Sequence, residues 1–303
     1  MLVRTNAGPK VMKRLGSGES PFVPTRFALR PQSRTLGALV EGVDLRRPCE
    51  PALHAELASA LREWKVLFFR DQHLTAQEQG SFVAQWGDLT DDQLTGGVPA
   101  PNPADNVVVF TRDAQTVGLE NGWHSDGTFR PMPTMGTMLQ AIEVPEVGGD
   151  TVFADMAAAY DNLPDDTRHF LEGRTARHDW SLGAYAAKYG ADLARLQAEV
   201  PPIRHPVVVR HPVTDRPTLF VNRMFTASID GLTPDESDEL LDRLCRQADL
   251  PEVQCRFHWE PGSVAFWDNI AVQHYGVNDY YPERRVMARA TYFSREHDAL
   301  VAW

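Results

Sequence analysis

Many short strand-like segments, each bounded by turn residues, constrain the fold of this chain more than any other feature. They are concentrated in the second half, at residues 137–142, 150–153, 263–267 and 286–293, with a predicted hairpin between 206–210 and 218–221. Helices interrupt these strands without the regular alternation of strand and helix that a parallel sheet requires. We therefore expect a mixed, mainly β fold, with a double-stranded β-helix (jelly roll) core and with inserted and flanking α-helices.

The helices themselves are predicted from apolar spacing and from capping patterns. Leu53, Leu57 and Leu61 recur every four residues, which is typical of one buried helix face. Capping-box patterns begin at Thr75 and at Thr233, each with a glutamate three residues later. The expected helices are residues 51–64, the segment from the Thr75 cap to near Gly87, residues 157–172 and residues 234–247.

Charge and composition exclude several classes of partner. The 303 residues include 30 Lys and Arg against 41 Asp and Glu, a net charge of −11, which repels nucleic acid and anionic membranes. No apolar run reaches the roughly 18 residues of a membrane-spanning helix. Three cysteines without a CxxC pattern argue against a disulfide framework, so a cytoplasmic location is expected.

The domain organisation is expected to be simple. Residues 1–24 mix basic residues with Gly and Ser and contain no apolar run of signal-peptide length, so they are predicted to form a flexible arm. No later shift in composition marks a boundary, and residues 25–303 are predicted to form a single domain. The Pro- and Gly-rich segment 96–105 is expected to be a loop of functional importance.

His124-Ser125-Asp126 is the first candidate for chemistry, because residues i and i+2 of a strand project from one face and could bind one metal ion. The same spacing occurs twice elsewhere in the chain, so taken alone it favours a solvated or core-capping histidine over a metal ligand. His274 could supply a second imidazole. Two histidines and one carboxylate leave three positions open on ferrous iron, whereas zinc would be expected with three or four closed ligands.

Arg285 and Arg289 are the second candidate. They lie four residues apart on a strand-like stretch, so their side chains face the same way. If they point inward they require buried anions, and a dicarboxylate cosubstrate could pair with one guanidinium. The alternative is an ordinary basic edge strand.

Together these motifs resemble the iron(II)- and 2-oxoglutarate-dependent dioxygenases of the taurine dioxygenase type, a family that includes 2,4-dichlorophenoxyacetate dioxygenases. The resemblance extends from about Arg26 to Ser294. The segments that carry it are Trp123 to Asp126, Gly148 to Thr151, Trp267 to Asn269 with His274 and Tyr275, Asn278 to Tyr280, and Arg284 to Thr291.

The resemblance implies a complete set of site residues and cofactors. His124, Asp126 and His274 would be the iron ligands, Thr151 and Arg285 would bind 2-oxoglutarate, and Arg289 would lie beside the substrate. Fe(II), 2-oxoglutarate as cosubstrate and O2 would be required, with succinate and CO2 as coproducts of C–H hydroxylation. Asp126 favours hydroxylation over halogenation, since halogenating relatives carry a small residue at that position.

The substrate is expected to be a small, anionic organic molecule other than taurine. Residues 87–123 lack the His and Tyr with which taurine-specific members hold their substrate, and contain acids such as Asp92 and Glu120 instead. These two acids are either substrate-binding residues that face a cationic or hydroxylated group or ordinary solvated loop residues. A taurine, alkylsulfonate or sulfate dioxygenase, a zinc hydrolase and a non-catalytic jelly-roll protein that binds a small acid stay as alternatives, and a homo-oligomer is possible.

Overall fold

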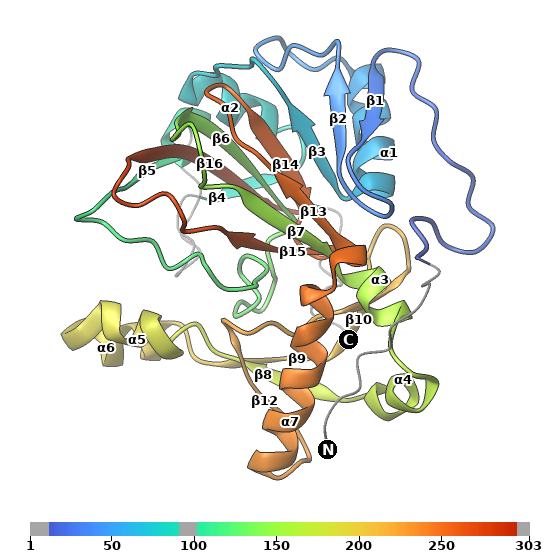
Figure 1. Ribbon diagram of the computed structural model, residues 1–303, viewed down its shortest axis with the longest axis vertical. Coiled ribbons are helices and arrows are strands. Elements are labelled where there is room, and N and C mark those ends of the chain that lie inside the picture. The colour runs from blue at the N-terminus through green and yellow to red at the C-terminus, as the bar shows by residue number, and fades with distance from the viewer. Residues whose placement is uncertain (1–11, 91–101, 296–303) are drawn as a thin grey trace.

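The computed structural model describes residues 12–90 and 102–295, which combine helices with four β-sheets (Figure 1). The strands are β1 (Ala28–Pro31), β2 (Ala38–Glu41), β3 (Val66–Phe69), β4 (Asp88–Thr90), β5 (Val108–Arg112), β6 (Gly136–Glu143), β7 (Thr151–Asp155), β8 (Thr175–His178), β9 (Ile203–Pro206), β10 (Val208–Arg210), β11 (Pro217–Leu219), β12 (Thr226–Ile229), β13 (Gln254–Phe257), β14 (Val264–Asp268), β15 (Val272–Gly276) and β16 (Arg285–Phe293). The helices are α1 (Pro51–Trp64), α2 (Ala76–Val83), α3 (Met156–Asp161), α4 (Asp165–Leu171), α5 (Gly183–Tyr189), α6 (Leu193–Glu199) and α7 (Pro234–Cys245), with short 3-10 turns η1 (Pro103–Asn106), η2 (Gly190–Asp192), η3 (Arg246–Asp249) and η4 (Pro251–Val253).

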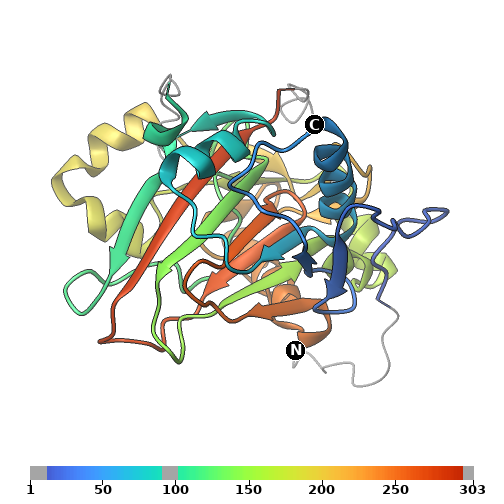
Figure 2. The same ribbon diagram turned by 90° about the horizontal axis from the view of Figure 1, so that it is seen from above.

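The largest sheet has eight strands in the order β1-β2-β3-β14-β6-β16-β4, with β5 also paired to β16 (Figure 2). All its pairs are antiparallel except β2 with β3. Strand β3 is apolar and buried at all four positions because both faces of the sheet are covered there. In β3, Leu67 and Phe69 face one core and Val66 and Phe68 face another, as the two-residue period of a strand requires.

A second sheet, β13-β7-β15, covers one face of the large sheet. The rings of Phe68 and Phe257 stack with centroids 4.1 Å apart, and Phe153 lies 5.7 Å from Phe68. These three aromatic side chains come from β3, β13 and β7, so they join the two sheets. The core between the sheets fixes the position of β15, which carries His274.

Helices α1 and α2 cover the other face of the large sheet. Leu57 and Leu61 of α1 belong to the same core as Phe266 of β14, and Phe82 of α2 packs edge-on against Phe266 with centroids 5.7 Å apart. Both predicted capping boxes are present, at the start of α2 and of α7. A lower lobe is built from sheet β12-β8-β9 with α4, α5, α6 and α7 (Figure 1).

One helix prediction is wrong. The segment 157–172 forms two helices, α3 and α4, rather than one. Pro164 lies between them, and a proline lacks the N–H of a helix interior and disfavours helical geometry in the residue before it. The predicted hairpin is confirmed as β10 and β11, in which Val208 pairs with Leu219 and Arg210 with Pro217.

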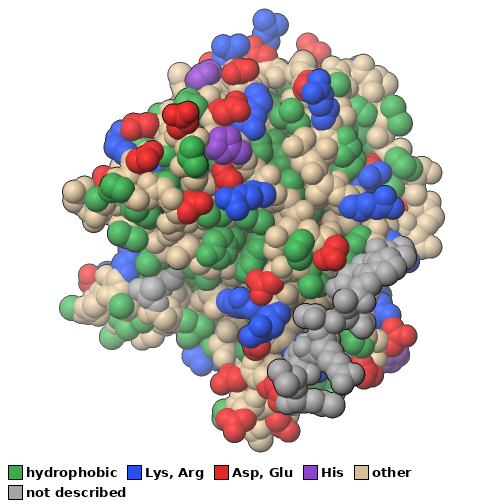
Figure 3. Space-filling model, in the orientation of Figure 1, with side chains coloured by type: hydrophobic (Ala, Val, Ile, Leu, Met, Phe, Trp, Pro, Cys, Tyr) green, Lys and Arg blue, Asp and Glu red, His purple; other side chains and the backbone are tan. Residues whose placement is uncertain are grey.

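The predicted mixture of strands and inserted helices is confirmed. Within residues 12–90 and 102–295 no helix has the length and apolar character needed to cross a bilayer. On the face shown in Figure 3, acidic and basic side chains are interspersed rather than gathered by sign. Part of the segment predicted as an arm contacts the domain, since Arg14 and the Phe22 amide both bind the carboxylate of Glu63.

Candidate active site

Two backbone hydrogen bonds bring the candidate histidines together. The amide of His124 donates to the carbonyl of His274 over 3.1 Å, and the amide of His274 donates back over 2.8 Å. The imidazole centroids are 4.1 Å apart. The predicted strand geometry of 124–126 is wrong, because His124 forms only an isolated bridge and the chain turns at Asp126. The turn nevertheless directs the Asp126 carboxylate at both imidazoles.

The three candidate ligands form a compact, buried group. Asp126 Oδ1 lies 3.8 Å from Nε2 of His124 and 3.8 Å from Nε2 of His274. The ligand atoms of all three residues lie within 4.8 Å of one another, and each residue is at least nine-tenths buried. This arrangement could hold one metal ion.

The electrostatics of the group suit a metal ion. His124 Nδ1 lies 2.8 Å from the carbonyl oxygen of Gly122, which can only accept a hydrogen bond, so Nδ1 carries a proton and the neutral form of the imidazole has its lone pair on Nε2. Burial, and then the neighbouring His124, lower the pKa of His274 to about 3. Burial acts to raise the pKa of Asp126, but the two histidines and Arg289 outweigh it and keep the pKa below its ordinary value. Neutral imidazole and ionised carboxylate are the forms that bind metals.

The three residues line a cavity with about 740 Å³ of space between its walls, part of which is open to solvent. Its apolar lining consists of Phe110, Phe129, Leu139, Phe225 and Trp267. Its polar lining, apart from the three candidate ligands, includes Glu120, Thr151, Arg285 and Arg289. The structure therefore brings together all the predicted site residues except Asp92, which lies outside the described residues.

Arg285 is a buried cation that still has room for an anion. It is 8% exposed, and its Nε has no hydrogen-bond partner within the described part of the chain. Burial lowers the pKa of its guanidinium, yet arginine stays charged at any physiological pH. Trp259 lies beside it, 5.9 Å from ring centroid to guanidinium carbon, and donates its indole N–H to Thr151. A buried charge of this kind calls for an anionic partner.

Glu120 and Arg289 complete the polar wall. Glu120 is already paired, since Arg112 donates to both of its carboxylate oxygens. Burial acts to raise the pKa of Glu120, but the hydrogen bond from Arg112 prevails and the pKa lies below its ordinary value. Arg289 is half-buried, with its guanidinium carbon 5.7 Å from the ring of Phe110. Arg285 and Arg289 thus share one face of β16, as their spacing predicts.

Sequence reasoning missed Arg112 and the aromatic walls of the cavity. Arg112 and Phe110 enter the site because β5 pairs with β16, where Arg112 lies opposite Arg285. The ring of Phe225, from the loop before β12, lies nearly perpendicular to that of His124 with centroids 6.0 Å apart. No local pattern marks these residues, because their roles arise from tertiary pairing alone.

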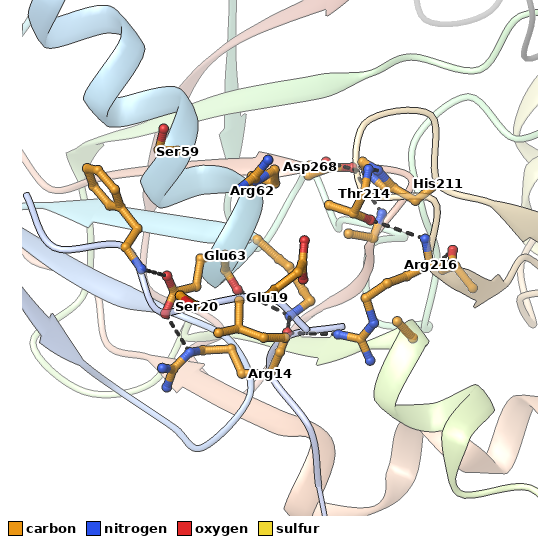
Figure 4. Close-up of a pocket in the computed structure, with 16 residues that line it drawn as sticks. Arg14, Glu19, Ser20, Ser59, Arg62, Glu63, His211, Thr214, Arg216 and Asp268 are labelled. Carbon is orange, nitrogen blue, oxygen red and sulfur yellow. Dashed lines mark hydrogen bonds and ion pairs between the residues drawn. The ribbon is translucent and has the colours of Figure 1, made fainter. Parts of the chain in front are cut away.

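A second charged pocket lies beneath residues 14–22, near the end of α1 (Figure 4). Its charged groups bind one another: Arg14 binds Glu63 at 2.7 Å, and His211 Nε2 donates to Asp268 over 2.7 Å. At its edge, Arg216 binds Asp161 at 3.0 Å. This pattern is typical of a structural network, and we assign it no catalytic role.

Comparison with known proteins supports the reading of the first cavity. Residues 28–291 match the model of the taurine catabolism dioxygenase TauD, TfdA family. The chain is 32% identical to an alkylsulfatase of Acinetobacter baylyi, over 88% of this chain and 86% of that protein. It is 34% identical to an (S)-phenoxypropionate/alpha-ketoglutarate-dioxygenase of Sphingobium herbicidovorans, over 86% and 93%.

A solved structure agrees with these sequence matches. A taurine dioxygenase from Burkholderia xenovorans superposes with a TM-score of 0.75 at 33% identity, over 89% of this chain and 92% of that one. At the level of the family, the predictions of a 2-oxoglutarate-dependent dioxygenase and of its cofactors Fe(II), 2-oxoglutarate and O2 are confirmed. The chain belongs to the taurine catabolism dioxygenase TauD, TfdA family.

Proposed function

We propose that this protein hydroxylates a C–H bond of a small, anionic organic substrate, with 2-oxoglutarate converted to succinate and CO2. One observation carries the proposal. The cavity that holds His124, Asp126 and His274 also holds Arg285, a buried cation with a donor that lacks a partner within the described residues. A metal-binding group and an anion-binding group in one cavity suit a reaction that needs iron and a dicarboxylate.

His124 Nε2, His274 Nε2 and Asp126 Oδ1 would hold Fe(II). The donor set fits, since it combines two imidazole nitrogens with one carboxylate oxygen and would leave positions on the ion for the cosubstrate. When bound, iron and 2-oxoglutarate would activate O2, the oxidant, which takes two electrons from the conversion of 2-oxoglutarate to succinate and CO2 and two from the C–H bond that is hydroxylated. The protein's own task is to hold these groups and the target carbon in place.

Arg285 and Thr151 would bind the distal carboxylate of 2-oxoglutarate. The guanidinium can donate two parallel hydrogen bonds to a carboxylate. Trp259 connects the two residues, because its ring lies 5.9 Å from the Arg285 guanidinium and its indole N–H donates to the Thr151 hydroxyl. The apolar side chains of Phe110, Phe129 and Phe225 would exclude water from the reacting atoms.

Arg289 would meet the anionic end of the substrate. A negatively charged substrate agrees with the names of two relatives, an alkylsulfatase and a phenoxypropionate dioxygenase. The aromatic walls favour a substrate with an apolar body, so an aryloxyalkanoate is the first candidate and an alkyl sulfate the second. Glu120 is a weaker candidate for substrate contact, because Arg112 already occupies its carboxylate.

The fold supports the same proposal. We propose that the two sheets which share the core of Phe68, Phe153 and Phe257 are the halves of a jelly roll. Support comes from the antiparallel pairing of the second sheet and of strands β3, β14, β6 and β16 in the large one, and from the superposition on a taurine dioxygenase. In this arrangement β15 and β16 would deliver His274 and Arg285 to the same cavity.

The test is succinate release from 2-oxoglutarate, O2 and Fe(II), screened over sulfonates, alkyl sulfates, aryloxyalkanoates and amino acids. We expect substrate-dependent succinate and a visible charge-transfer band when Fe(II) and 2-oxoglutarate are added without oxygen. Release of sulfate or phenol would identify a product that fragments after hydroxylation. Binding of 2-oxoglutarate with no succinate from any substrate would favour the non-catalytic alternative, and turnover without O2 would favour a hydrolase.

A further inference from the structure

A buried chain of hydrogen bonds leads from β14 to the carboxylate of Asp126. The indole N–H of Trp267 donates to Asn269 Oδ1 over 2.7 Å. The amide nitrogen of Asn269 donates to two hydroxyls, Thr137 Oγ1 at 2.9 Å and Thr134 Oγ1 at 3.2 Å. Thr137 then donates to Asp126 Oδ2 over 3.0 Å, and Thr134 donates to the backbone carbonyl of Asp126 over 2.9 Å.

Every hydrogen bond in this chain has a fixed direction. An indole nitrogen can only donate, so the atom of Asn269 that faces Trp267 is the carbonyl oxygen. The amide nitrogen must therefore face the two threonines, and it cannot accept from them. Each hydroxyl is left with one proton, which points to an oxygen of Asp126 that can only accept.

Burial makes this network of hydrogen bonds rigid. Trp267, Asn269 and Thr137 are at most 1% exposed and Thr134 is 2% exposed, so water does not compete for these bonds. The Asn269 amide is held at its backbone too, because its N–H donates to the carbonyl of Met135 over 2.9 Å. A fully satisfied buried network of this kind specifies one side-chain arrangement.

We infer that Asn269 is a positioning residue. Through Thr137 it orients the Asp126 carboxylate so that Oδ2 accepts a hydrogen bond and Oδ1 alone is available to bind a metal ion. The inference rests on the proposed function, in which Asp126 binds iron. Oδ1 is the atom that lies 3.8 Å from both imidazoles, on the side away from the network. A carboxylate that binds through one oxygen keeps a further position on the metal open for the cosubstrate or O2.

The test uses Co(II) as a probe of the full-length protein, with the dissociation constant and the visible spectrum as readouts that do not depend on turnover. Thr137→Val keeps the shape of the side chain and removes its donor. We expect about 10- to 100-fold weaker Co(II) binding and an altered spectrum. Thr137→Ser restores a hydroxyl and should bind Co(II) within about threefold of the wild type.

Thr291→Val is the matched control. Its hydroxyl lies 3.3 Å from that of Thr137 and is equally buried, but it makes no contact with Asp126 among the described hydrogen bonds. We expect wild-type Co(II) affinity in this variant. Equal losses in Thr291→Val and Thr137→Val, or no loss in Thr137→Val, would overturn the inference in favour of simple packing.

Asn269→Asp tests the origin of the chain. An aspartate here would accept both threonine protons and so withdraw them from Asp126, and Co(II) binding should weaken at least as much as in Thr137→Val. Wild-type affinity would overturn the role of Asn269. If a thermal melt in the presence of a chelator shows that Asn269→Asp is unfolded, the inference is tested with Thr137→Val, Thr137→Ser and Thr291→Val instead. Failure of the wild type to bind Co(II) would instead count against the proposed function.

Discussion

Two charged pockets within the described part of the chain differ in how their charges are paired. In the pocket beneath residues 14–22, Arg14 binds Glu63 and His211 binds Asp268 (Figure 4). In the cavity of β15 and β16, the Asp126 carboxylate faces two imidazoles that are not placed as its hydrogen-bond donors, and Arg285 keeps a donor without a partner within the described residues. Internal pairing indicates a structural role, and incomplete pairing indicates a ligand site.

Lys65 shows why the amount of buried charge alone is not diagnostic. Burial lowers the pKa of its ammonium, although Asp155 at 3.1 Å opposes the effect. The ammonium also donates to the carbonyls of Thr35, Glu63 and Arg14. Lys65 is more buried than Arg285, yet it leaves no place for an external ligand.

The largest effect is expected from removal of a candidate metal ligand. His124→Ala, Asp126→Ala and His274→Ala should each abolish 2-oxoglutarate turnover, because two remaining ligands hold the ion weakly and in the wrong orientation. The measurement is O2-dependent succinate formation with saturating Fe(II). His169→Ala, at an exposed position of α4, is the matched control and should keep full turnover. Full turnover in any of the three ligand variants would contradict the assignment of the site.

Substitutions in the second charged pocket, which Lys65 also lines, should lower the stability of the fold and leave ligand binding unchanged. Asp155→Asn removes the charge opposite Lys65 while the amide oxygen can still cap α3, as Asp155 Oδ1 does now. Leaving a buried cation without its counter-ion costs about 3–5 kcal/mol of unfolding free energy. Urea unfolding measures the loss, and Co(II) affinity at low temperature should stay at the wild-type value. A loss of affinity without a loss of stability would remove the distinction between the two pockets.

Arg285→Gln should weaken the binding of 2-oxoglutarate and leave the stability of the fold unchanged. The distal carboxylate of 2-oxoglutarate would lose a charge-assisted, two-bond partner, which is worth about 2–4 kcal/mol, or roughly 30- to 1000-fold in the KM for 2-oxoglutarate. Co(II) binding and the urea midpoint should change little. Arg204→Gln, which removes an exposed arginine paired with Asp230, is the control. An unchanged KM in Arg285→Gln would transfer the role to Arg289.

The sequence predicts the parts of the site that depend on local spacing. Arg285 and Arg289, four residues apart on strand β16, share a direction as their spacing predicts. His124 and Asp126 also meet in the cavity, but a turn at Asp126 brings them together and not the strand geometry that their spacing suggested. The contact between Asn269 and Thr137 spans 132 residues, so no local pattern could reveal it. Such a contact exists only once β14 has paired with β6.

The same distinction applies within the fold. The capping boxes of α2 and α7 are local hydrogen-bond patterns and could be predicted. The pairing of β5 with β16, which brings Phe110 and Arg112 to the cavity, depends on which strand edges meet. Pro164 is a local signal for the break between α3 and α4, and the prediction of one helix over 157–172 did not take it into account.

The smallest effect concerns the choice of substrate. Taurine carries an ammonium group that needs an acceptor, and Glu120 is the acidic side chain that lines the described cavity beside the three ligands. Its carboxylate is already paired with the guanidinium of Arg112, which offsets the negative charge and weakens its attraction for the ammonium group of taurine. We therefore expect taurine to have about tenfold lower kcat/KM than the best aryloxyalkanoate or alkyl sulfate, measured by succinate release.

Arg112→Gln provides the matched test of this reasoning. It frees the Glu120 carboxylate without touching the candidate ligands, so the disadvantage of taurine should shrink while turnover of the preferred anionic substrate falls or stays the same. In this variant Glu120 would lose its partner Arg112 and become available to bind a cationic group of the substrate. If taurine is turned over by the wild type as efficiently as any other compound, the Arg112–Glu120 pair is no barrier, and the acceptor for the ammonium group must lie elsewhere in the cavity.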